Sequence, residues 1–138
     1  MPYTEVGWQP LVRRDAGSPW LAHLPSEFPV YQWHSDTFDL PPGADWLLSS
    51  PWCPNQAFAW GDKVLALQGH PEVTEELVRW WLQDWSHLLD ETQASQQGLR
   101  QMLTDLPTRI ASLNQVAEGF YRHWLGLAFG EPAVARAV

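Results

Sequence analysis

The feature that most constrains the fold of this chain is a change in residue patterning near residue 73. Most of the twelve prolines fall before residue 72, where they separate short segments rich in aromatic and β-branched residues. After Thr74, apolar residues recur at helical spacing instead. Short strands followed by helices predict a mixed α/β chain.

Three short strands are expected over residues 6–12, 28–33 and 46–50. Two further strands, over residues 56–60 and 63–68, flank Gly61-Asp62. A two-residue connection of this composition is typical of a tight hairpin. The prediction is therefore a set of short strands that ends in a hairpin, just before His70.

The last third of the chain is predicted to be helical. Thr74 suits an N-cap, and Glu75 and Glu76 follow in the first turn, where the helix dipole favours carboxylates. The expected apolar stripe consists of Leu77, Trp81, Trp85 and Leu88, widened by Val78, Leu82 and Leu89. At this spacing, Trp80, Trp81 and Trp85 are better explained by core packing than by a ligand box.

Two more helices are expected downstream. A weak one has apolar positions at Leu99, Met102, Leu103 and Leu106. A longer one begins at Pro107 and ends at Gly130, with its apolar positions at Ile110, Leu113, Val116, Ala117, Phe120, Tyr121, Trp124 and Leu127. Residues 1–130 are expected to form one domain, and residues 131–138 a loose tail.

Composition excludes several classes of function. The net charge of -8, with eight Lys and Arg, supplies no basic surface for nucleic acid. No apolar run approaches the roughly 18 residues of a membrane span, so a cytoplasmic protein without a membrane partner is predicted. A single cysteine, Cys53, excludes an intramolecular disulfide and a cysteine-rich zinc site. No cofactor and no metal are predicted.

The segment Gln68-Gly69-His70-Pro71-Glu72 carries the chemistry. Residues i and i+2 of an extended segment point the same way, so His70 and Glu72 can face one reacting group together. A carboxylate on one imidazole nitrogen fixes the tautomer of a base that activates a thiol or hydroxyl. The alternative is structural: His70 ends a strand and Glu72 precedes a helix N-terminus.

Four blocks in order extend this pattern: residues 5–8 (EVGW), 33–41 (WHSDTFDLP), 54–58 (PNQAF) and 68–74 (QGHPEVT). Together they resemble the class I glutamine amidotransferases, especially stand-alone members related to the glutaminase domain of GMP synthase. The resemblance covers residue 5 to about residue 81 well and the helical remainder loosely. Gly69 departs from the family, which usually carries a bulky aromatic residue there.

The resemblance implies the C-terminal portion of a flavodoxin-like fold and an activity that hydrolyses glutamine to glutamate and ammonia. A cysteine thiolate would attack the side-chain amide, with His70 as base and proton donor and Glu72 holding its ring. His34, Ser35 and Asp36 would line the glutamine pocket. For these three, local hydrogen bonding at a strand end is the alternative.

The family's nucleophile, in a Gly-x-Cys-x-Gly turn upstream of the Glu-x-Gly-Trp block, has no counterpart in this sequence. Cys53 lies in Pro51-Trp52-Cys53-Pro54, without a glycine elbow, and is expected to be inert or packed. The chain is therefore expected to be a truncated or split enzyme component, inactive alone. It would need a chain that carries the other half, or it would self-associate. A non-catalytic binding or interaction module is the second hypothesis.

Overall fold

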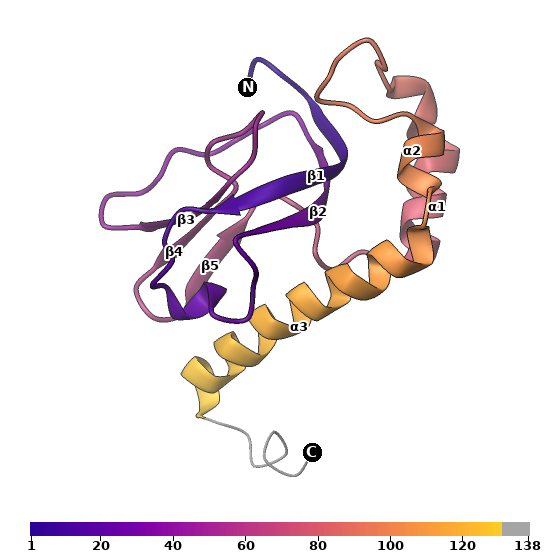
Figure 1. The fold of residues 1–138 in the computed structure, drawn as a ribbon. Coiled ribbons are helices and arrows are strands. Elements are labelled where there is room, and N and C mark those ends of the chain that lie inside the picture. The colour runs from indigo at the N-terminus through magenta and orange to yellow at the C-terminus, as the bar shows by residue number, and fades with distance from the viewer. Residues whose placement is uncertain (131–138) are drawn as a thin grey trace.

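The computed structural model describes residues 1–130 and places strands before helices (Figure 1). The strands are β1 (Glu5–Arg13), β2 (Glu27–His34), β3 (Asp45–Ser49), β4 (Ala57–Trp60) and β5 (Val64–Leu67). The helices are η1 (Pro19–Leu21), α1 (Glu75–Trp85), η2 (Ser86–Leu88), α2 (Leu99–Leu103) and α3 (Leu106–Phe129). The mixed α/β class predicted from the sequence is confirmed. The predicted loose tail, residues 131–138, lies outside the described residues.

The five strands form one sheet in the order β2-β1-β3-β4-β5, and every neighbouring pair is antiparallel. The β1–β2 pairing is the longest and sets Glu5 opposite His34. The β4–β5 hairpin is confirmed, but its connection is three residues long, 61–63, and not two. Gly61 begins this connection with a φ of 60°, a conformation that glycine adopts without steric cost.

A loop segment extends the sheet beyond its strands. The Val6 amide donates to the Ser95 carbonyl at 3.0 Å, and the Gln97 amide donates to the Val6 carbonyl at 3.0 Å. The Gln97 side chain then accepts from the Trp8 amide and donates to the Trp8 carbonyl. No local sequence pattern indicates this pairing, because these bonds join residues about 90 positions apart in sequence.

Helix α1 begins as predicted, since the Thr74 hydroxyl accepts from the Leu77 amide at 3.1 Å. Its predicted stripe is confirmed in part: Val78 and Leu82 are fully buried, and Leu77, Trp81 and Leu89 pack partly buried against the core. Trp80 and Trp85 are exposed, and Leu88 lies in η2 with 64% of its surface accessible. Hydrophobic spacing alone could not choose between two adjacent faces when tryptophan occupies both.

Helix α3 confirms the third predicted helix, with a proline in its first turn and Gly130 as its C-cap. Its first half buries Ile110, Leu113, Val116, Ala117 and Phe120. The predicted stripe fails further along, since Tyr121, Trp124 and Leu127 are exposed. The Trp124 indole instead donates to the Lys63 carbonyl of the β4–β5 connection at 2.7 Å.

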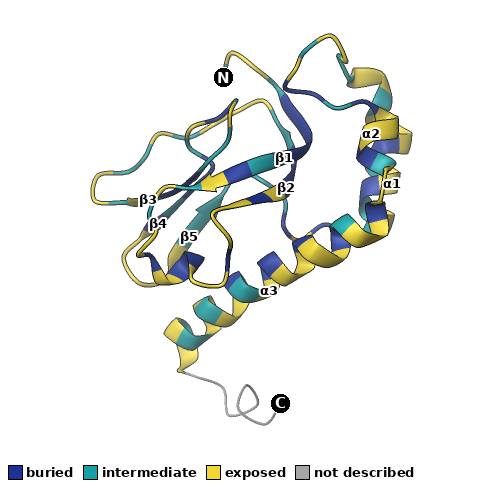
Figure 2. Ribbon diagram, in the orientation of Figure 1, coloured by how far each residue is buried: buried dark blue, intermediate teal, exposed yellow. Residues whose placement is uncertain are grey.

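The hydrophobic core lies between the sheet and the helices, where the buried residues of both gather (Figure 2). Long helix α3 contacts β2 and η1, while α1 contacts α3 and α2 contacts β1 (Figure 1). Among residues 1–130, no helix combines the length and apolarity that crossing a bilayer requires.

Candidate active site

His70 and Glu72 lie just past strand β5 and are hydrogen-bonded to each other. The distance from His70 Nδ1 to Glu72 Oε1 is 3.0 Å, across Pro71. With an ionised carboxylate as acceptor, Nδ1 carries the hydrogen and Nε2 carries the lone pair. Within residues 1–130, Nε2 makes no hydrogen bond. The pair thus presents one basic nitrogen, and 29% of the His70 side-chain surface is accessible.

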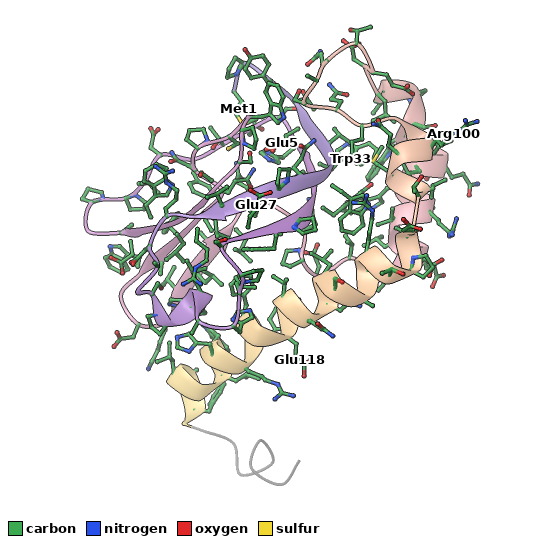
Figure 3. All side chains as sticks on the ribbon, in the orientation of Figure 1. Met1, Glu5, Glu27, Trp33, Arg100 and Glu118 are labelled. Atoms are coloured by element: carbon green, nitrogen blue, oxygen red, sulfur yellow. The ribbon has the colours of Figure 1, made fainter. Side chains whose placement is uncertain are left out.

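Backbone and aromatic contacts fix the His70 ring. The His70 amide donates to the Tyr31 carbonyl on β2 at 2.8 Å. The Trp81 ring of α1 meets the imidazole edge to face, with 5.0 Å between ring centroids. Trp81 is itself held between Trp33 and Trp85, and Trp33 lies on the side of the sheet that faces the helices (Figure 3). Sheet and helix therefore position the imidazole together.

Gly69, immediately before His70, lies against β2 with no room for a side chain. A Cβ atom at this position would stand 2.6 Å from Gln32 Nε2 and 2.7 Å from Val30 Cγ1. Side chains of β2 occupy the space that an aromatic side chain at position 69 would need. Gly69 is therefore matched in size to its β2 neighbours, Val30 and Gln32.

A second polar cluster lies at the start of β1, where Glu5 is completely buried. Glu5 Oε2 accepts from the Gln56 side-chain amide at 2.7 Å and lies 3.1 Å from His34 Nε2. The other nitrogen of His34, Nδ1, lies 2.9 Å from the Asp36 carbonyl oxygen. Both ring nitrogens thus face acceptors, unlike those of His70.

Cys53 is fully buried beside this cluster. Its sulfur contacts the Thr37 hydroxyl at 3.3 Å and the Asn55 carbonyl at 3.7 Å. Sγ also lies within 4.8 Å of ligand atoms of Glu5 and His34. Cys, His and Glu are therefore near one another, but both His34 nitrogens are already engaged. Within residues 1–130 neither nitrogen is hydrogen-bonded to Sγ, so the ring is not placed to remove the thiol proton.

No family model matches this chain. A glutamine-hydrolysing GMP synthase from Thermomicrobium roseum is 44% identical over 64 residues, which are 46% of this chain and 12% of that enzyme. A solved glutamine amidotransferase from Methylobacillus flagellatus aligns with a TM-score of 0.86 and 33% identity, over 91% of this chain and 53% of that one. A glutamine amidotransferase structure from Thermotoga maritima aligns with a TM-score of 0.75 and 25% identity, over 88% of this chain and 51% of that one.

The chain has a class I glutamine amidotransferase-like fold. It spans about half the length of the solved amidotransferases that it matches. The likeness to GMP synthase is confined to a smaller share of that enzyme. The resemblance drawn from the four sequence blocks is confirmed at the level of the fold.

Within this amidotransferase-like fold, the predicted residues form two neighbouring groups. Ser35 and Asp36 are exposed just after β2, and the Ser35 hydroxyl pairs with that of Thr4 at 3.0 Å. The Asp36 carbonyl also accepts from the Gln68 side-chain amide at 2.7 Å. This bond joins the segment after His34 to the strand that leads to His70.

Sequence reasoning missed Glu5 and Gln56 as members of the His34 group. Glu5 lies in the Glu-x-Gly-Trp block and Gln56 in the Pro-Asn-Gln-Ala-Phe block, so the signal was present in two of the four blocks. A buried carboxylate needs partners, and a glutamate directly before a predicted strand should prompt a search for them.

Proposed function

We propose that this chain supplies the general base and its orienting carboxylate to a class I glutamine amidotransferase site. His70 is the base and Glu72 holds its ring. The bond of 3.0 Å between Nδ1 and Oε1 carries this proposal, because it leaves Nε2 available to a reacting group. The same proposal makes residues 1–130 one part of a complete flavodoxin-like fold.

The proposed reaction is glutamine hydrolysis through a thioester. A thiol gives its proton to His70 Nε2 and attacks the side-chain amide carbon of glutamine. His70 then protonates the departing nitrogen, and ammonia leaves as the tetrahedral intermediate collapses. His70 Nε2 then removes a proton from water, which attacks the thioester. Glutamate and the thiol are released.

The nucleophilic thiol comes from a partner segment and not from Cys53. Cys53 is buried, and both nitrogens of its histidine neighbour face oxygen atoms of Glu5 and Asp36, whereas Nε2 of His70 has no hydrogen-bond partner within residues 1–130. The partner segment carries the cysteine turn of the amidotransferases and binds beside His70. In this proposal, backbone groups of the exposed residues Ser35 and Asp36 contact the α-amino and carboxylate groups of glutamine.

A chimeric enzyme tests the proposal. In the Methylobacillus flagellatus protein, the segment that aligns with this chain is replaced by residues 1–130, and ammonia release from glutamine is measured. The chimera is expected to be active, and His70→Ala is expected to lower its turnover about 10²- to 10⁴-fold. Glu72→Gln should cause a smaller loss, because the ring keeps its other contacts.

The matched control is His87→Ala, which removes an exposed histidine in η2 and should leave turnover unchanged. Folding of each variant is verified by its thermal unfolding. Full turnover in the His70→Ala chimera would contradict the assignment. A folded chimera without ammonia release would favour the alternative, a non-catalytic binding module.

A further inference from the structure

The cluster of Glu5, His34 and Cys53 has the donor atoms of a metal site. One carboxylate oxygen, one imidazole nitrogen and one sulfur lie within 4.8 Å of one another. They come from β1, the end of β2 and the loop before β4, so no local sequence pattern could reveal them. Zinc binds all three kinds of ligand, and three protein ligands with a fourth position left for solvent occur in its catalytic sites.

The hydrogen bonds around His34 support this assignment. The Asp36 carbonyl can only accept, so the hydrogen of the neutral ring lies on Nδ1. The Nε2 lone pair then faces Glu5 Oε2 at 3.1 Å, which is repulsive unless a positive charge lies between them. A backbone carbonyl on the distal nitrogen is the usual second contact of a metal-binding histidine.

Glu5 provides an independent observation. Its carboxylate is fully buried, and Oε1 has no hydrogen-bond partner within the described chain. Gln56 donates to Oε2 and orients the carboxylate, as the outer partners of metal ligands do. A buried carboxylate oxygen without a partner is costly, and coordination to a cation would remove that cost.

Charge and size restrict the ion. The Glu5 carboxylate and a Cys53 thiolate together balance a dication, with His34 neutral. A sulfur ligand favours zinc or cobalt over magnesium or calcium. The three ligand atoms lie up to 4.8 Å from one another. Ligand atoms bonded to one zinc ion at roughly 2.0–2.3 Å lie closer together than this, so the largest separation must shorten by about 1 Å. The Cys53 sulfur can move by this amount if it gives up its contact with the exposed Thr37 hydroxyl and binds the ion instead.

We propose that Glu5, His34 and Cys53 bind one thiophilic divalent cation, with zinc as the natural occupant. The ion would bridge β1, β2 and the loop before β4. It would enter past His34, the member whose side chain retains 11% accessibility. This site does not depend on the proposed glutaminase chemistry and can exist without it.

Cobalt titration of the purified full chain tests the site. The wild-type protein should bind one Co²⁺ and develop a thiolate-to-cobalt charge-transfer band with the strong visible bands of tetrahedral cobalt. Cys53→Ser should abolish the charge-transfer band. His34→Gln should weaken binding at least tenfold. His87→Gln, which removes an exposed histidine, is the matched control and should bind like the wild type.

A second measurement covers the case in which Cys53→Ser does not fold. Zinc binds the native state in this proposal, so excess Zn²⁺ should raise the thermal midpoint of the wild type and of His87→Gln, but not of His34→Gln. If the folded wild type shows no charge-transfer band, a proton and not a metal joins His34 to Glu5, and the proposal is wrong. Equal cobalt affinity in the wild type and His34→Gln would also overturn it.

Discussion

Two histidines in this chain each contact a carboxylate, and the difference between them is the basis of the different roles proposed for them. His34 lies between Glu5 and a backbone carbonyl, so both nitrogens are used inside the protein. His70 uses one nitrogen for Glu72, whose side chain is half exposed. Surroundings, and not residue type, therefore make one histidine a candidate base and the other a structural or metal-binding group.

Gly69→Ala is predicted to destabilise the protein by about 1–3 kcal/mol. The added Cβ would stand 2.6 Å from Gln32 Nε2 and 2.7 Å from Val30 Cγ1. The amide end of Gln32 can move, but the branched Val30 side chain is restricted at χ1. Urea unfolding at equilibrium measures the change.

A double-mutant cycle with Val30→Ala tests the stated cause. If the Val30 methyl group is the obstacle, the double variant should be more stable than the sum of the single losses predicts, by about 0.5–3 kcal/mol. Strictly additive losses would show that the cost of Gly69→Ala arises elsewhere. Gly69 in place of an aromatic residue would then need another explanation.

At the scale of elements, Gly7 lets the 95–97 segment pair with β1. Its φ is 101°, and a Cβ there would lie 2.5 Å from Gln97 Oε1 and 2.7 Å from Gln97 Cβ. Gly7→Ala should therefore cost about 2–4 kcal/mol, through backbone strain and lost Gln97 contacts. Hydrogen exchange should show loss of protection at the Trp8 amide, which donates to Gln97.

Gly126→Ala is the matched control for this prediction, with the opposite sign. Gly126 lies in α3, and a Cβ there would meet nothing within 4 Å. Alanine is the better helix former, so stability should rise by up to about 1 kcal/mol. Equal destabilisation by Gly7→Ala and Gly126→Ala in thermal unfolding would refute the role given to Gly7.

The strands, the hairpin and the helix starts were predictable because each rests on local chemistry. Thr74 caps α1 and Pro107 opens α3 through interactions that span only a few residues. The buried face of α1 was not predictable, since choosing Val78 over Trp85 depends on what packs opposite. The contact of His70 with Glu72 was also local, two residues apart. The Glu5–His34–Gln56 group needed the β1–β2 register and the β3–β4 loop.

At the scale of the whole molecule, Tyr31 connects the sheet to two helices. Its ring packs on Trp8 of β1 and Trp81 of α1, and its hydroxyl donates to Met102 Sδ of α2 at 3.4 Å. No part of its surface is accessible. The hydroxyl can therefore meet water only when the sheet and the helices separate, so its ionisation reports on global unfolding.

Burial raises the pKa of Tyr31 well above its ordinary value, and this predicts alkaline instability. Above about pH 10 the unfolded chain loses the Tyr31 proton while the folded chain keeps it. The free energy of unfolding should then fall as pH rises, by up to about 1.4 kcal/mol per pH unit from this group. Below pH 10 the contribution of this group to pH dependence vanishes, because both states keep the proton.

Tyr31→Phe isolates this effect, since it keeps the ring and removes the ionising group. Its free energy of unfolding, measured by urea titration between pH 8 and pH 11, should fall less steeply above about pH 10 than that of the wild type. Tyr121→Phe removes an exposed hydroxyl from α3 and should keep the wild-type slope. Equal slopes for Tyr31→Phe and the wild type would mean that water reaches Tyr31 before the sheet and helices separate. The core between them would then open locally, without global unfolding.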